Sequence, residues 1–152
     1  MPKKRGARSL EMNAAARDVY ALVADIRRMG EWSPETFRAR WVGHPSEPRP
    51  GARFRGWNRW LFFVWPTDPV IEAAEPGVVF SFVTTLFGMG RFTRWTYRFS
   101  DRPGGGTMVE ESWEQVGTVP LFSRVFLSGR RERQLSAAMD RTLQRIKAAA
   151  EG

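Results

Sequence analysis

Residues 119–150 constrain the fold most, because they have the pattern of one long helix with a single apolar stripe. Pro120 suits the first turn of a helix, where its missing N–H costs no hydrogen bond. Apolar or small residues recur at helical spacing at Leu121, Val125, Ser128, Leu135, Met139, Thr142 and Ile146. The opposite side carries Arg124, Arg130, Arg131, Arg133, Arg141, Arg145 and Lys147. This pattern is typical of a helix with one face on another layer and one in water. Since the preceding chain is mostly strand-like, we expect the helix to cross a sheet.

The composition argues against several kinds of site. The chain has no Cys, which excludes disulfides and thiolate chemistry. Its one histidine, His44, lies in a proline-rich loop, which argues against a zinc site or a histidine-based catalytic triad. Gly104, Gly105 and Gly106 lie between two strands and indicate a hairpin turn rather than a phosphate-binding loop. We therefore expect neither a metal nor another cofactor.

The net charge of +8 comes from 24 basic and 16 acidic residues, and nearly all of the basic residues are Arg. One interpretation is attraction to nucleic acid or to an anionic membrane. The other is a compositional bias towards Arg and Ala, which raises the charge without a function, and we favour it. We therefore expect no nucleic-acid partner. A transient contact of the C-terminal helix with an anionic membrane stays open as the weaker alternative.

The sequence predicts a basic, disordered N-terminus over residues 1–8 and one domain over residues 9–150. The basic start resembles the first part of a signal peptide, but charged residues interrupt the apolar segment that should follow. No apolar run approaches the length of a membrane span. We therefore expect a cytoplasmic protein. The sequence leaves its oligomeric state open.

The expected elements before the long helix are one strand, two short helices and six further strands. Asn13 is the predicted N-cap of a helix over residues 14–24, and a short helical turn follows over residues 27–32. The predicted strands are residues 9–12, 37–43, 52–59, 60–74, 78–87, 92–100 and 107–116, the fourth bent at Pro66 and Pro69. Serial hairpins give an antiparallel meander with one face on the helix and one in water.

This order and several local phrases resemble the START/polyketide cyclase/Bet v 1-like (SRPBCC) superfamily, in particular bacterial proteins of the polyketide cyclase/dehydrase and lipid transport type. The phrases are residues 13–25, 29–35, 51–54, 75–77, 80–82, 105–107 and 110–114. The resemblance implies an α+β helix-grip fold, in which a curved seven-stranded antiparallel sheet surrounds the C-terminal helix. It also implies a cavity for an apolar or amphipathic molecule, in carriers, sensors or aromatase and cyclase enzymes. Residues 61–69 depart from the superfamily pattern, because this segment is longer and more apolar than that strand pair usually is in the superfamily.

Strand alternation places one carboxyl group among the inward-facing side chains. Glu111 shares a face with Val109 and Trp113. A five-residue turn before its strand, which matches residues 102–106, sets it opposite Tyr97, whereas a slip of two residues would set it opposite Trp95. Burial would raise the pKa of Glu111 and suit it to general acid–base work with Tyr97. A purely structural Glu111, hydrogen-bonded to Tyr97 or to an Arg, is the alternative that we favour. The predicted ligand-binding residues are Asn58, Phe80, Phe82, Thr84, Trp95, Tyr97, Glu111, Trp113, Leu135 and Met139.

Three functions remain open at this point. The first is binding of a hydrophobic or amphipathic small molecule, such as a lipid or a polyketide-like compound. The second is a cyclase or dehydratase that uses Glu111 and Tyr97 as its acid and base. The third and weakest is a basic surface that binds anionic membrane. It requires Arg130, Arg131, Arg133, Arg141 and Arg145 to be exposed and mostly unpaired.

Overall fold

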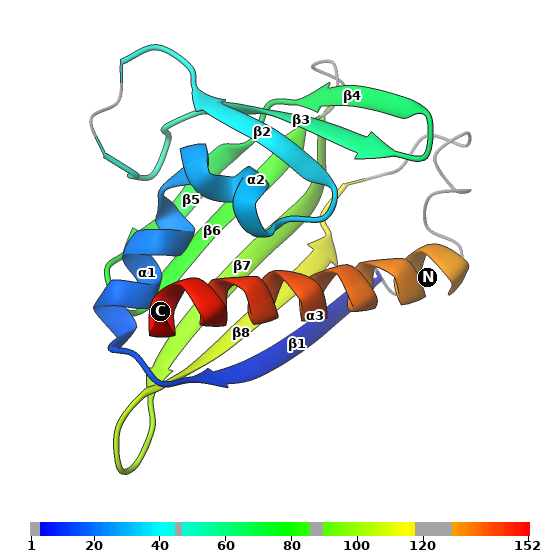
Figure 1. Ribbon diagram of the computed structural model, residues 1–152. Helices are drawn as coiled ribbons and strands as arrows, with labels where there is room; N and C mark the ends of the chain where they lie inside the picture. The colour runs from blue at the N-terminus through cyan, green and yellow to red at the C-terminus, as the bar shows by residue number, and fades with distance from the viewer. Residues whose placement is uncertain (1–3, 45–46, 86–89, 118–128) are drawn as a thin grey trace.

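The computed structural model describes residues 4–44, 47–85, 90–117 and 129–152, and these ranges hold eight strands and three α-helices (Figure 1). In chain order the elements are β1 (Arg5–Met12), α1 (Ala16–Ala24), the 3-10 turn η1 (Ile26–Arg28), α2 (Met29–Trp32), β2 (Thr36–Trp41), β3 (Phe54–Trp60), β4 (Phe63–Thr67), β5 (Val70–Glu75), β6 (Val79–Thr85), β7 (Arg91–Asp101), β8 (Thr107–Gln115) and α3 (Gly129–Glu151).

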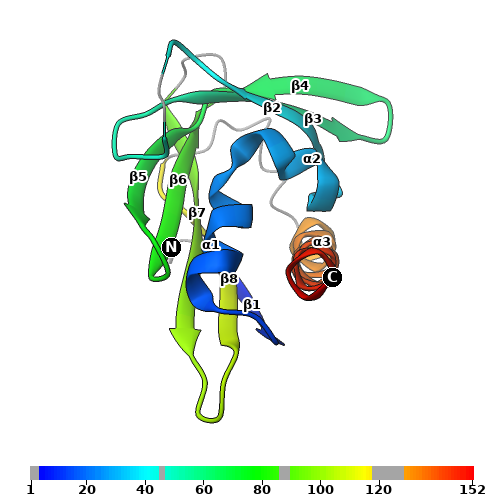
Figure 2. The ribbon, with the colours of Figure 1, turned by 60° about the vertical axis from the view of Figure 1, so that its left-hand side comes forward.

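The strands form two antiparallel sheets. The larger has the order β1-β8-β7-β6-β5, the smaller has the order β2-β3-β4, and an isolated bridge between Arg53 and Val70 connects them. In Figure 2, which shows α3 nearly end-on, the helices lie on the concave side of the larger sheet and the smaller sheet covers one end. The predicted α+β class, with a curved antiparallel sheet and a C-terminal helix, is confirmed.

The strand count is eight rather than seven because the stretch predicted as one bent strand divides at Pro69. Pro66 lies inside β4, opposite Trp57, which is tolerated because β4 is an edge strand of the smaller sheet. Pro69 has no N–H to donate, and its carbonyl accepts from the Phe54 N–H at 3.1 Å. The chain then leaves the smaller sheet and enters the larger one as β5.

The first strand begins earlier than predicted. β1 starts at Arg5 rather than at Ser9, and residues 5–8 pair with residues 111–114 of β8. The prediction of a disordered terminus is therefore wrong for residues 5–8. The reason is tertiary, since the free edge of β8 provides hydrogen-bond partners that no local pattern reveals. Two ion pairs also join this end of the chain to α3, Lys4 with Glu132 and Arg8 with Asp140.

The predicted N-cap at Asn13 is wrong. Helix α1 begins at Ala16, and its N-cap residue Ala15 makes no capping side-chain hydrogen bond. The backbone N–H of Asn13 instead donates to Glu151 Oε2 at 2.7 Å, near the end of α3. This contact links the two ends of the fold, which lie 138 residues apart in the sequence.

Helix α3 ends at Glu151, close to the predicted end at residue 150. Its predicted start near Pro120 lies outside the described residues, as does the first half of the predicted stripe. In the described part, Leu135, Met139, Leu143 and Ile146 are buried at helical spacing. None of the described helices combines the length and the apolar character that crossing a bilayer requires.

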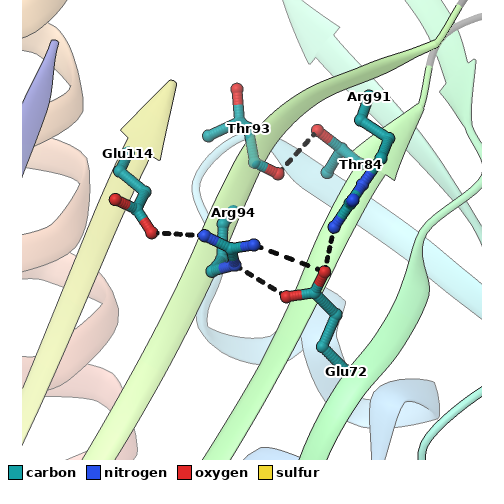
Figure 3. Close-up of polar contacts among 6 residues, drawn as sticks. All are labelled: Glu72, Thr84, Arg91, Thr93, Arg94 and Glu114. Carbon is teal, nitrogen blue, oxygen red and sulfur yellow. Dashed lines mark hydrogen bonds and ion pairs between the residues drawn. The ribbon is translucent and has the colours of Figure 1, made fainter. Parts of the chain in front are cut away.

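The outer face of the larger sheet carries an ion-pair network centred on Arg94 (Figure 3). Arg94 Nε donates to Glu72 Oε2 at 2.6 Å, and its Nη1 donates to Glu114 Oε1 at 2.6 Å. Arg91 also pairs with Glu72. The hydrogen bond from Arg94 lowers the pKa of Glu72. The network joins β5, β7 and β8 across β6, where Val83 lies opposite Arg94 and is only 2% exposed.

Candidate functional site

A pocket of about 390 Å³ lies between α3, the concave face of the larger sheet and the smaller sheet. Most of its wall is aromatic or aliphatic, with Phe54, Phe82, Trp95, Trp113, Leu135 and Met139 among its side chains. A volume of this size falls in the range of small-molecule sites in proteins. Part of the aromatic side chains of the fold therefore surrounds a hollow, while others, such as Tyr20, Phe80 and Phe99, pack in the solid core.

All the residues predicted for ligand binding line this pocket except Phe80. Phe80 is fully buried instead, and its ring packs edge-on against Tyr20 of α1 at a centroid distance of 6.3 Å. It lies on the same face of β6 as Phe82 but two residues further from the pocket, where α1 covers the sheet. The prediction was wrong for Phe80 because alternation identifies the face of a strand, not the position along it that a cavity occupies.

Glu111 and Tyr97 meet as predicted. They are directly opposed in the β7–β8 register, and the Tyr97 hydroxyl donates to Glu111 Oε1 at 3.0 Å. Glu111 is only 4% exposed, and this burial raises its carboxyl pKa to about 8; the hydrogen bond from Tyr97 opposes the rise and the charge of Asp140 adds to it. Burial, with the nearby carboxyl, also raises the pKa of Tyr97. A largely neutral carboxylic acid is therefore held in the pocket wall at neutral pH.

The other predicted polar residues are already satisfied by the protein. Asn58 Oδ1 accepts from the Thr36 hydroxyl at 2.5 Å, and its Nδ2 donates to the Trp65 carbonyl and to the Thr67 hydroxyl. The Thr84 hydroxyl donates to the Thr93 carbonyl on the neighbouring strand (Figure 3). These bonds hold the wall in place and leave little capacity for a ligand.

Two buried polar atoms of the pocket residues have no hydrogen-bond partner among the residues that the structure describes, Glu111 Oε2 and Trp113 Nε1. An unpaired buried polar atom costs about 1–3 kcal/mol. The indole nitrogen of Trp113 lies against Gly6 of β1. Glu111 Oε2 is therefore a buried carboxyl oxygen of a pocket residue that the described residues leave without a partner.

The sequence analysis missed an ion pair that lines the pocket. Arg131 Nη2 lies 2.7 Å from each carboxylate oxygen of Glu35, and the Arg131 side chain is only 13% exposed. The Arg131 guanidinium also lies over the Trp60 ring, 5.6 Å from its centroid. A signal for this position existed, because Arg131 is one helical turn before Leu135 and two before Met139, on the same stripe.

The predicted basic surface of α3 is therefore only partly present. Arg133, Arg141 and Arg145 are exposed as predicted, although Arg145 also donates to the Trp32 carbonyl. Arg131 is part-buried and paired, so its predicted exposure was wrong. The side chain of Arg130 lies outside the described residues. Within the described ranges, no three His, Cys, Asp or Glu side chains gather closely enough to hold a metal ion.

The comparisons with known proteins agree with this geometry. The model of a family described as "Polyketide cyclase / dehydrase and lipid transport" matches residues 5–151. The chain belongs to this family. No curated protein matches it.

Several solved structures share the fold of this chain. The di-domain ARO/CYC BexL from the BE-7585A biosynthetic pathway matches at 22% identity with a TM-score of 0.74, over 99% of this chain and 50% of that one. The chain thus spans about half the length of that di-domain protein. The Zhui aromatase/cyclase from Streptomyces sp. R1128 matches at 14% identity with a TM-score of 0.72, over 99% of this chain and 94% of that one. A START superfamily protein from Mycobacterium smegmatis matches at 11% identity with a TM-score of 0.72, over 99% of this chain and 98% of that one.

We expect Gly6→Ala to displace a side chain of the pocket wall, although Gly6 itself lies on β1 and does not line the pocket. A Cβ added at Gly6 would lie 2.7 Å from Trp113 Nε1, so the indole must shift towards the pocket. Overpacking of this kind costs about 1–3 kcal/mol. Urea unfolding should show that loss, and tryptophan emission should change because Trp113 moves. Ala7→Gly, at an exposed neighbour on the same strand, is the control for an altered strand. A Gly6→Ala protein with unchanged emission and stability would contradict the close contact.

Proposed function

We propose that the pocket binds an apolar or amphipathic small molecule, such as a lipid or a polyketide-like compound, and that Glu111 and Tyr97 orient it. The observation that carries the proposal is the combination of a 390 Å³ apolar pocket with one buried acid–phenol pair in its wall. Ligand sites commonly have this composition, a largely apolar wall with a few polar groups that determine orientation. Membership of a family described by polyketide cyclisation and lipid transport supports the same ligand class.

The chemistry of the pair narrows the ligand further. Because the Tyr97 hydroxyl donates to Oε1, the proton of a neutral Glu111 is best placed on Oε2, which has no partner among the described residues. A carbonyl or hydroxyl oxygen of a ligand could accept that proton in a hydrogen bond. A ligand carboxylate at the same place would lose its hydration in an apolar pocket, which is costly for a charged group. We therefore expect a ligand whose buried end carries a neutral oxygen.

Native mass spectrometry of the protein as purified, followed by organic extraction, tests this proposal. The expected result is an added mass that denaturation releases unchanged, from a mostly apolar compound bearing a carbonyl or hydroxyl group. Where no compound co-purifies, titration with fluorescent fatty-alcohol and fatty-acid analogues takes its place, and the alcohol should bind more tightly. A protein that binds neither analogue would overturn the proposal.

A second candidate function is an enzyme of the cyclase or dehydratase type. The observation in its favour is the Glu111 carboxyl, whose pKa of about 8 is close to the pH at which a general acid or base works best. In this function Glu111 and Tyr97 exchange protons with the substrate. Glu111→Gln should then abolish turnover while the substrate still binds, because the amide keeps the size and an acceptor oxygen for Tyr97. A ligand that is released unchanged by the wild-type protein favours the carrier.

A further inference from the structure

The β3–β4 hairpin ends in four consecutive exposed apolar residues, here called the apolar tip: Leu61, Phe62, Phe63 and Val64. Their exposed fractions are 68, 95, 64 and 56%, in the same order. The hairpin extends past the larger sheet, over the first described turns of α3 (Figure 1). Isolated apolar residues on a surface are ordinary, whereas a contiguous group of large ones marks a site of interaction.

The turn of the β3–β4 hairpin contains a residue whose backbone conformation is unfavourable for its type. Leu61 has a φ of 56° and is the one non-glycine residue with positive φ in the part of the chain that the structure describes. Two-residue hairpin turns favour Gly or Asn in such positions, because a Cβ in the left-handed region costs about 1–2 kcal/mol. A large apolar side chain at this position therefore weakens the hairpin and exposes more apolar surface. Neither effect contributes to folding.

The outer face of the smaller sheet, which runs on from the apolar tip, carries Arg55, paired with Asp68, and three further arginines, here called the arginine face: Arg38, Arg40 and Arg59. Arg38 and Arg40 lie over the Trp57 ring, at 5.5 and 5.3 Å from its centroid. Arg59 lies opposite Val64 of the apolar tip. None of the three forms an ion pair with a described residue. The nearby acids are engaged elsewhere, Asp68 with Arg55 and Glu35 with Arg131.

The apolar tip is continuous with the pocket. Phe63 and Val64 line the pocket although both are more than half exposed, and Trp65 follows them on the same strand. A molecule leaving the pocket past β4 would therefore meet the apolar tip before it meets bulk water. Arg131 and Glu35 also line the pocket, and the Arg131 guanidinium lies over the ring of Trp60 at the end of β3.

We propose that the β3–β4 hairpin docks on an anionic lipid surface, with the apolar tip in the headgroup and upper acyl region and the arginine face against lipid phosphates. Large apolar side chains next to cationic ones match the two layers of such an interface. Docking would place the pocket opening at the bilayer, from which an apolar ligand could enter or to which it could return. This surface differs from the helix face expected from the sequence, because on α3 Arg131 is paired in the pocket wall. The proposal concerns the surface of the protein and does not depend on what the pocket holds.

Vesicle co-sedimentation tests the proposal with the whole chain. Wild-type protein should bind vesicles of equimolar phosphatidylcholine and phosphatidylglycerol at low salt, and bind pure phosphatidylcholine more weakly. The double variant Leu61→Ser/Phe62→Ser should lose about tenfold or more in affinity, because two large side chains no longer leave water. The matched control is Val78→Ser, at an apolar residue that is 51% exposed in a different turn, and it should bind like the wild type.

Two charge-reversal variants, one on the arginine face and one on α3, test which of the two surfaces meets the lipid. Arg38→Glu/Arg40→Glu should weaken binding to the mixed vesicles about tenfold or more at low salt, and the difference should shrink as salt screens it. Arg133→Glu/Arg141→Glu, at exposed positions of α3, changes the net charge equally and should weaken binding by less than about threefold. Circular dichroism should show that all the variants are folded.

Several results would overturn the proposal. The wild type could fail to bind the mixed vesicles, the serine variant could bind them as well as the wild type does, or the α3 variant could lose as much affinity as the hairpin variant. A dimer without lipid that the serine variant dissociates, seen by sedimentation velocity, would assign the apolar tip to a second copy of the chain. Ala138→Trp, which fills the pocket, should still bind vesicles, so failure of the pocket proposal can be told from failure of this one.

Discussion

Glu111→Gln is expected to stabilise the protein at alkaline pH and to flatten the pH dependence of its stability. The carboxyl has a pKa of about 8 in the folded chain and about 4.3 in an unfolded one. Between these values the native state holds one proton more than the unfolded state. The free energy of unfolding therefore falls as the pH rises from about 4.3 to about 8, and this contribution levels off above that. A shift of this size corresponds to about 3–5 kcal/mol. Glutamine keeps an acceptor for Tyr97 and does not titrate.

Urea unfolding at several pH values between acid and alkali provides the measurement. The difference between Glu111→Gln and wild type should move in favour of the variant as the pH rises. Glu110→Gln is the matched control, because Glu110 is the adjacent residue of β8 and its side chain points to the opposite face of the strand. That variant should keep the wild-type dependence. Parallel curves for Glu111→Gln and wild type would show that Glu111 is not a buried neutral acid.

Ala138→Trp is expected to abolish ligand binding with little loss of stability. Ala138 lies on α3 and lines the pocket, so the indole would occupy space that a ligand needs. We expect an affinity loss of about a hundredfold or more, equivalent to about 2.7 kcal/mol. Because the side chain fills a hollow rather than a packed core, the cost to the fold should stay below the 1–3 kcal/mol that is typical of overpacking. Titration with an apolar fluorescent probe measures the loss.

Ala137→Trp is the matched control for this prediction. It adds the same side chain one residue earlier, at an exposed position of α3, and should bind the probe like the wild type. Thermal unfolding of both variants separates a filled pocket from a damaged fold. If Ala138→Trp is stable and still binds the probe at wild-type affinity, the ligand does not occupy this pocket, and the proposed function loses its main support.

The inner polar pair was predictable because the interactions that determine it are local. Alternation along one strand placed Glu111 on the face of Val109 and Trp113, and the short turn before β8 set the register that opposes it to Tyr97. The helical period likewise placed Leu135 and Met139 on the pocket side of α3. Both arguments use periods of the backbone itself, which the fold does not change.

What only the tertiary structure decided depends on residues that are distant in the sequence. Glu35 and Arg131 are 96 positions apart, and their pairing required the α2–β2 turn to meet the start of α3. Phe80 lost its predicted place in the pocket because α1 covers that end of β6. Residues 5–8 became ordered because β8 had a free edge. In each case the local pattern did not determine which element the side chain or the strand edge contacts, and the packing of a separate element decided it. Local periods predict the direction in which a residue points, but the distance between elements is set by the packing of the whole core.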